Sequence, residues 1–142
     1  MEENILPSFP DYKLYNDRSI YVGTFLGGPL VAGYLAAENY KKLGQPDKVK
    51  NAWIIALIAT LAILGAIFFI PGLEKIPNYL IPLIYTAIAQ FLVQKSQGNA
   101  IKAHIAQGGQ IYSAWRAALI GLIGVLILVA LVCVLVLLTD KR

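Results

Sequence analysis

Four stretches of the chain contain no Asp, Glu, Lys or Arg, and each is long enough to cross a lipid bilayer. They run over residues 19–37, 51–73, 76–94 and 117–139. Because an α-helix rises about 1.5 Å per residue, the shortest of them reaches roughly 28 Å, close to the thickness of the hydrocarbon core. The pattern predicts an all-α, polytopic membrane protein with four transmembrane helices. The expected spans cover about residues 19–40, 51–71, 77–94 and 114–139.

The four spans pair into two helical hairpins with a weak internal similarity. Pro29-Leu30-Val31 aligns with Pro82-Leu83-Ile84, and in each half a basic loop then leads to Ala-Trp and a long apolar helix. Such a parallel repeat is a known architecture of small transporters. We expect a single transmembrane domain over residues 19–139, preceded by a polar amino-terminal tail (1–18) and followed by a short carboxy-terminal tail (140–142).

The first span is interrupted at Gly27-Gly28-Pro29. Proline inside a helix removes a backbone hydrogen bond, and in lipid the freed carbonyl must find a partner in neighbouring protein. We expect a spanning helix that is kinked at this point, because the internal repeat makes it the counterpart of the third span. The alternative is a re-entrant first segment, which would leave only three spans and would keep the amino-terminal tail in the cytoplasm.

Composition and charge support a membrane location and predict an orientation. Hydrophobic residues make up 58% of the chain and charged residues 14%, whereas a soluble domain has about 25% charged residues. Seven basic residues follow the first and third spans, against five elsewhere. The positive-inside rule therefore predicts that loops 41–50 and 95–113 are cytoplasmic and that the carboxy terminus lies outside an inner membrane. In the re-entrant alternative the count becomes nine against three.

The basic loops are also candidates for contact with anionic lipid headgroups, although their charge could serve only to fix orientation. Nucleic acid is not expected as a partner, because the basic residues are sparse and no binding module is present. The candidate headgroup contacts are Lys41, Lys42, Lys48, Lys50, Lys95, Lys102 and Arg116.

Small residues recur at four-residue spacing in three of the expected spans. Such spacing lets helix backbones approach closely in lipid. We expect these residues to pack helices within the bundle, and the alternative is a homo-oligomer or an association with another membrane protein. The candidates are Gly23 and Gly27, Ala52 and Ala56, Ala114 and Ala118, and Gly121, which follows Ala117.

Chemistry-bearing residues are scarce. No ionisable side chain lies within the four charge-free runs, and Thr60, Thr86 and Gln90 are the main polar groups there. Ion-coupled transport generally uses a buried ionisable group, so a proton-coupled antiporter is disfavoured. His104 is the only histidine and is expected to be exposed on a short interfacial helix over residues 99–107. We expect no enzymatic activity, no cofactor and no metal site.

Three segments resemble those of small bacterial multi-pass inner-membrane proteins. They are TFLGGPLVAGY (24–34), NYKKLGQP (39–46) and IPNYLIPL (76–83). The resemblance implies a four-helix inner-membrane protein and no particular activity. From the packing signals we predict a non-enzymatic accessory or scaffold subunit that acts through helix–helix association. The alternative is an oligomeric channel or facilitator with a path near Thr60, Thr86 and Gln90.

Overall fold

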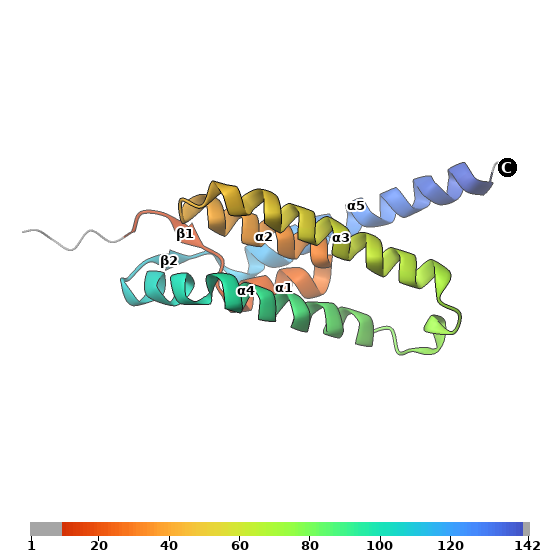
Figure 1. The fold of residues 1–142 in the computed structure, drawn as a ribbon, viewed down its shortest axis with the longest axis horizontal. Coiled ribbons are helices and arrows are strands. Elements are labelled where there is room, and N and C mark those ends of the chain that lie inside the picture. Colours follow the sequence, from red (N-terminus) through yellow and green to blue (C-terminus); the bar gives the residue numbers. More distant parts are fainter. Residues whose placement is uncertain (1–9, 141–142) are drawn as a thin grey trace, which may run out of the picture.

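The computed structural model describes residues 10–140, which form five helices arranged along one long axis (Figure 1). The helical fold class is thus confirmed, with the addition of a two-stranded parallel ladder in which β1 (Lys13–Leu14) pairs with β2 (Gln110–Ile111). A short 3-10 helix covers Leu73–Lys75. The helices are α1 (Asp17–Gly27), α2 (Pro29–Lys42), α3 (Pro46–Phe69), α4 (Leu80–Ala106) and α5 (Ala114–Asp140).

Local sequence explains where α1 and α2 begin and end. The Asn16 side chain accepts a hydrogen bond of 3.0 Å from the Ser19 backbone N–H, which caps α1. The helix stops at Gly28, whose φ of +84° is strained for any residue with a Cβ. Pro29 then occupies the first turn of α2, where its missing N–H costs no hydrogen bond.

The two helices form a hairpin, so the prediction of one kinked helix over residues 19–40 is wrong. A continuous helix would separate residues 15 and 39 by about 36 Å. In the structure the Tyr15 backbone nitrogen lies only 2.8 Å from Asn39 Oδ1. Figure 1 shows α1 and α2 running in opposite directions, so that the chain returns to the end from which it came. Gly28 at the tip makes this reversal possible, whereas a proline kink alone would only bend the helix.

The internal repeat and the long basic loops are also wrong. Pro82 lies in the first turn of an unbroken 27-residue helix, so the third span does not repeat the α1–α2 hairpin. The first loop is reduced to residues 43–45 between α2 and α3, and the second to residues 107–113 between α4 and α5. Lys48, Lys50, Lys95 and Lys102 are therefore helical, and residues 99–107 form no separate interfacial helix.

The amino-terminal tail is structured over the part that can be described. Leu14 and Tyr15 are almost completely buried, and β1 lies against β2. Residues 1–9 of the predicted tail, like residues 141–142 of the carboxy-terminal one, lie outside the described residues.

Among residues 10–140, two helices are both long and apolar enough to cross a membrane, namely α3 and α5. Four crossings are therefore not confirmed. The most apolar windows of these two helices are only 11% and 6% buried, which is far too little for core helices of a soluble protein. Their large apolar side chains instead face outward over most of their length.

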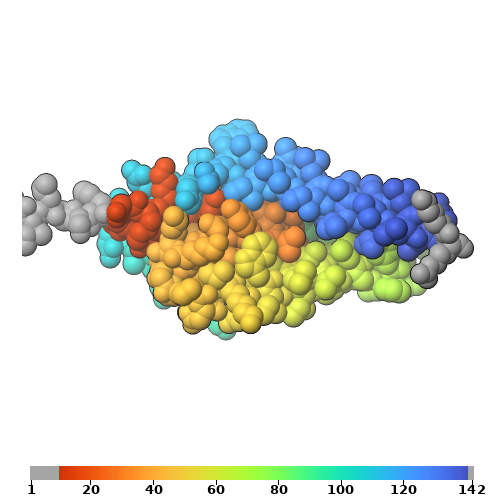
Figure 2. All heavy atoms as spheres, turned by 90° about the horizontal axis from the view of Figure 1, so that it is seen from above, coloured from red at the N-terminus to blue at the C-terminus, as the bar shows by residue number. Residues whose placement is uncertain are grey.

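The hairpin is wedged between α3 and α5, with α1 against α5 and α2 against α3. Figure 2 shows this order, with the hairpin in orange between yellow α3 and blue α5. Small residues make the contacts close: a Cβ on Gly121 would lie 2.8 Å from the Gly23 carbonyl oxygen, and Gly33 of α2 packs on Ala56. The candidate packing residues Gly23, Gly27, Ala56 and Gly121 thus lie at contacts within the chain.

Candidate functional site

A buried polar cluster ties α2 and α4 to the segment that precedes α1, at the end of the molecule where the hairpin begins and returns. Asn39 of α2 is completely buried. Its side-chain oxygen accepts from the Tyr15 N–H at 2.8 Å, and its Nδ2 donates to the Tyr15 carbonyl at 2.9 Å and to Gln97 Oε1 at 3.2 Å. Gln97 of α4 in turn donates from Nε2 to the Ala36 carbonyl at 2.9 Å. Every polar atom of these two amides therefore holds the hairpin shut or docks it on α4.

The Tyr15 ring extends this polar cluster to α5. Arg116 donates from Nε to Tyr15 Oη at 3.1 Å, and its guanidinium lies 4.7 Å from the centre of the Tyr112 ring. The two tyrosine rings pack with centroids 4.4 Å apart. Burial raises the pKa of the Tyr15 phenol above its usual value, and the neighbouring guanidinium offsets part of this increase. Arg116, a candidate headgroup contact, is thus engaged by two side chains of the protein.

His104 is buried, with only 3% of its surface exposed, so the prediction of an exposed histidine is wrong. Its Nε2 donates to the Gln110 carbonyl at 2.7 Å, and its ring stacks on Tyr12 at 4.9 Å. Gly109 packs directly on the ring, where a Cβ would collide with it. His104 therefore fixes the 107–113 connection and the β1 segment against the end of α4.

The candidate path residues do not come together. Thr60 Oγ1 donates to the Ala56 carbonyl of its own helix at 2.8 Å, on α3. Gln90 Nε2 donates to the Asp17 carbonyl at 3.0 Å and so joins α4 to α1, and Thr86 is buried one turn earlier on the same helix. Within residues 10–140 the structure has two main cavities, and neither is lined by all three of these residues. Gln90 thus makes an interhelical hydrogen bond.

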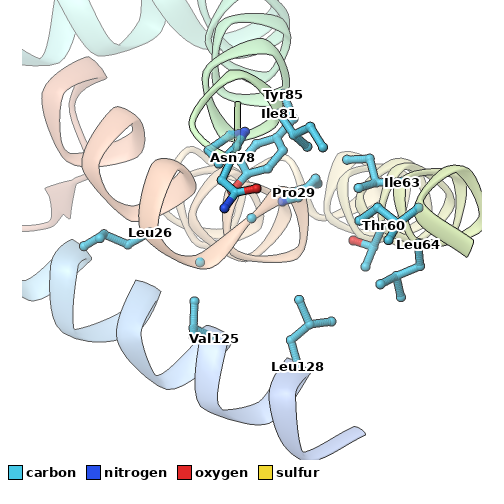
Figure 3. Close-up of a pocket in the computed structure, with 14 residues that line it drawn as sticks. Leu26, Pro29, Thr60, Ile63, Leu64, Asn78, Ile81, Tyr85, Val125 and Leu128 are labelled. Carbon is cyan, nitrogen blue, oxygen red and sulfur yellow. The ribbon is translucent and has the colours of Figure 1, made fainter. Parts of the chain in front are cut away.

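A first cavity of about 260 Å³ surrounds the tip of the hairpin. Figure 3 shows Leu26 and Pro29 of the tip facing Thr60 of α3, Tyr85 of α4 and Val125 of α5 across it. Its walls are almost entirely apolar. The Tyr85 hydroxyl donates to the Phe25 carbonyl at 3.2 Å, which gives the end of α1 one more partner. The cavity therefore offers an aqueous solute little polar contact.

A second cavity is a groove of about 730 Å³ between α3 and α4, with α2 as its floor. We call it the α3–α4 groove. Alanines dominate the α3 wall, and the α4 wall is formed by larger apolar side chains. Lys48 and Lys95 lie at the same end of the groove, from opposite walls. The walls comprise Lys48, Asn51, Ala52, Ile55, Ala56, Ala59, Ala62 and Ile63 of α3 and Tyr85, Ile88, Ala89, Leu92, Val93, Lys95 and Ser96 of α4.

The structure divides the seven candidate headgroup cations into different environments. Lys41 forms an ion pair with Glu38 at 2.9 Å, and Arg116 belongs to the polar cluster. Lys48 and Lys95 line the groove, where the Lys48 ammonium also lies 5.8 Å from the centre of the Tyr40 ring. The remaining cations, Lys42, Lys50 and Lys102, are exposed and line neither cavity.

Three buried polar residues, Asn39, Gln97 and His104, escaped the sequence-based prediction. For the two on α4 a signal existed: Val93, Gln97, Ile101 and His104 follow one another at intervals of four, four and three residues, which places them on one helix face. Ala114 and Ala118 are only half-buried at the start of α5, whereas Ala117 is fully buried.

Within residues 10–140 there is no group of three or more His, Cys, Asp or Glu side chains that could hold a metal ion. No protein-family model matches the chain, and neither does a curated protein or a solved structure.

Proposed function

We propose that the chain is an integral inner-membrane protein in which α3, α4 and α5 cross the bilayer and the α1–α2 hairpin re-enters it. The observation that carries this proposal is the exposed apolar surface of α3 and α5, because leaving such surfaces in water is costly. With 11 and 14 residues, α1 and α2 reach only about 16 and 21 Å. These lengths suit a segment that enters about halfway through a core of roughly 30 Å and returns.

The outer surface of α4 is more apolar than the mean hydropathy of the whole helix indicates. The polar side chains Thr86 and Gln90 face the hairpin and are largely hidden from the surroundings. The exposed positions of the same segment include Ile84, Ile88 and Phe91. A helix that turns its polar groups toward protein and its apolar groups outward is the usual solution in a membrane.

The hairpin also changes the orientation argument. When the first segment returns to its starting side, the amino terminus and the connections 43–45 and 107–113 share one side of the membrane. Nine basic residues then belong to that side and three to the other. The positive-inside rule favours this arrangement more strongly than four crossings, with the shared side in the cytoplasm and the carboxy terminus outside.

The proposed role is that of a non-enzymatic accessory or scaffold subunit that associates laterally with a second copy or another membrane protein. Residues 129–139 of α5 support this role, because they are mostly exposed and contain no charged side chain. The channel alternative has less support, since Thr60, Thr86 and Gln90 line no common cavity and two of them already make hydrogen bonds within the chain.

Single-cysteine labelling tests the proposed membrane arrangement. In a Cys133→Ser background, which removes the only cysteine, Lys13→Cys, Lys42→Cys and Gln107→Cys should react from the cytoplasmic side and Glu74→Cys from the outer side. All four positions are exposed. Labelling of Lys13→Cys and Lys42→Cys from opposite sides would restore a spanning first segment and overturn the re-entrant hairpin.

Crosslinking tests the proposed association. Cys133 lies exposed on α5 within residues 129–139, so a membrane-permeant bis-maleimide should give a discrete larger product in native membranes. The Cys133→Ser variant is the control and should give none. A protein that yields no product in membranes and is strictly monomeric in mild detergent would contradict the scaffold role.

A further inference from the structure

We propose that the α3–α4 groove binds one anionic lipid, with an acyl chain along the groove and the headgroup between Lys48 and Lys95. The inference rests on the proposed insertion into a membrane and adds a specific ligand to it. The two cations come from opposite walls at the same end of the groove, since Lys48 is the first lining residue of α3 and Lys95 is next to the last lining residue of α4. No acidic side chain is among the lining residues, so nothing in the lining neutralises the pair.

The dimensions of the groove match one leaflet. Along the α3 wall it extends from Lys48 to Ile63, which corresponds to about 22 Å of helix. A bilayer including its headgroups is about 40–45 Å thick, so half of it is about 20–22 Å. The cationic end therefore lies at headgroup level when the apolar end reaches the middle of the membrane. The hairpin tip at Pro29 marks the same depth, since it lines the groove at its apolar end.

The lining of the groove passes from polar at one end to apolar at the other, as a lipid does from its headgroup to its acyl chains. Asn51, Ser96 and Tyr40 add polar atoms near the two lysines, whereas Ala59, Ala62 and Ala89 line the deeper part. The alanines create the space, because each occupies a position where a larger side chain would fill the groove. The cationic end can thus hold a phosphate-bearing headgroup while the alanine-lined part holds its chain.

Size and charge favour a chain-like occupant with an anionic head over a helix from a partner or a second copy. Small-molecule and cofactor sites typically measure about 300–1,000 Å³. A partner helix would also have to supply acidic groups against Lys48 and Lys95, which an anionic headgroup provides by its own chemistry.

Native mass spectrometry and lipid titration of the purified full-length protein test the inference. The probes are phosphatidylglycerol and phosphatidylcholine with identical acyl chains, added in detergent, and soluble glycerol phosphate as a headgroup without chains. The wild type should retain one phosphatidylglycerol in preference to phosphatidylcholine and should not bind glycerol phosphate measurably. Equal retention of the two lipids, or equally tight binding of glycerol phosphate, would overturn the proposal.

Two matched pairs of variants separate this site from general surface charge and bulk. Lys48→Gln with Lys95→Gln should weaken phosphatidylglycerol binding roughly 30-fold, the change expected for two cations at about 1 kcal/mol each. The control Lys50→Gln with Lys102→Gln removes the same charge from the same helices outside the groove. Equal losses in both pairs would overturn the site.

The second pair tests the chain-binding part. Ala89→Phe fills the groove and should abolish lipid retention, whereas Ala87→Phe adds the same bulk to an exposed position of α4 outside it. Unchanged retention in Ala89→Phe would overturn the groove as the chain site. Flotation with phosphatidylcholine vesicles tests membrane insertion separately. If the protein inserts but shows no preference between the two lipids, only the lipid site is refuted. If the protein fails to insert, the proposed function is refuted as well.

Discussion

Replacing Asn39 by leucine should open the α1–α2 hairpin at its base. Leucine has nearly the same size and shape as asparagine, so the substitution removes hydrogen bonds without creating a large cavity. Three groups lose their partner: the Tyr15 N–H, the Tyr15 carbonyl and Gln97 Oε1. Tyr15 and Gln97 are each about 1% exposed, so water cannot easily replace what the amide provided.

The expected cost follows from these three groups. A buried polar group that loses its partner destabilises the folded state by about 1–3 kcal/mol. Three such groups give roughly 3 kcal/mol even at the lower end, which corresponds to about a 100-fold increase in the population of the opened hairpin. Because α1 also packs against α5, we expect the base of the hairpin to open while the rest of the bundle stays assembled.

Hydrogen–deuterium exchange of the protein in detergent measures this population directly. The amides from Tyr15 through the first turn of α1 should exchange about 100-fold faster in Asn39→Leu, with much smaller changes in the middle of α3. Asn99→Leu is the matched control, because Asn99 is exposed on α4. If Asn39→Leu exchanges like the control, the amide of Asn39 does not hold the hairpin and the reasoning is refuted.

Two further substitutions test other contacts of the hairpin. Gly121→Leu should destabilise the folded protein by about 1–3 kcal/mol through overpacking and so lower the thermal midpoint of unfolding, because a Cβ at this position would lie 2.8 Å from the Gly23 carbonyl oxygen. Gly65→Leu is the control and should leave the midpoint unchanged, since open space surrounds Gly65. Equal midpoints for the two variants would contradict the close approach of α1 and α5. Burial raises the pKa of the Tyr15 phenol in the folded state above 10, its value in the unfolded chain. The neutral phenol therefore contributes its full stabilisation of the folded state below pH 10, and this stabilisation is lost as the pH rises through the pKa of the folded state. The difference in unfolding free energy between wild type and Tyr15→Phe should therefore shrink above pH 10. A difference that stays constant across pH would refute the link between Tyr15 ionisation and stability.

The two most apolar helices could be predicted from the sequence to within a few residues. The predicted spans 51–71 and 114–139 correspond to α3 (Pro46–Phe69) and α5 (Ala114–Asp140). Both are uninterrupted apolar runs, and α3 begins with a proline in its first turn, where proline is favoured. Local composition determines such helices almost alone.

The hairpin could not be predicted in the same way, because Gly27-Gly28-Pro29 shows only that the helix is interrupted. Whether the chain bends or reverses there depends on contacts distant in the sequence. Tyr15 and Asn39 are 24 residues apart, and Ser19 donates to the Tyr112 carbonyl across 93 residues. The internal similarity to the third span misled the prediction, since both prolines lie in the first turn of a helix but only Pro29 follows a glycine at which the chain reverses.

The polar residues that hold the hairpin also explain why α4 is less apolar than α3 and α5. Gln90 and Gln97 lower the mean hydropathy of α4, and both donate hydrogen bonds to backbone carbonyls of the hairpin, at Asp17 and Ala36. Both side chains therefore join α4 to the hairpin, Gln90 at the start of α1 and Gln97 in the middle of α2. The side chains that make α4 look like a poor membrane helix are therefore those that the hairpin requires, and replacing them by leucine would make α4 more apolar while removing the partners that hold α1 and α2 in place.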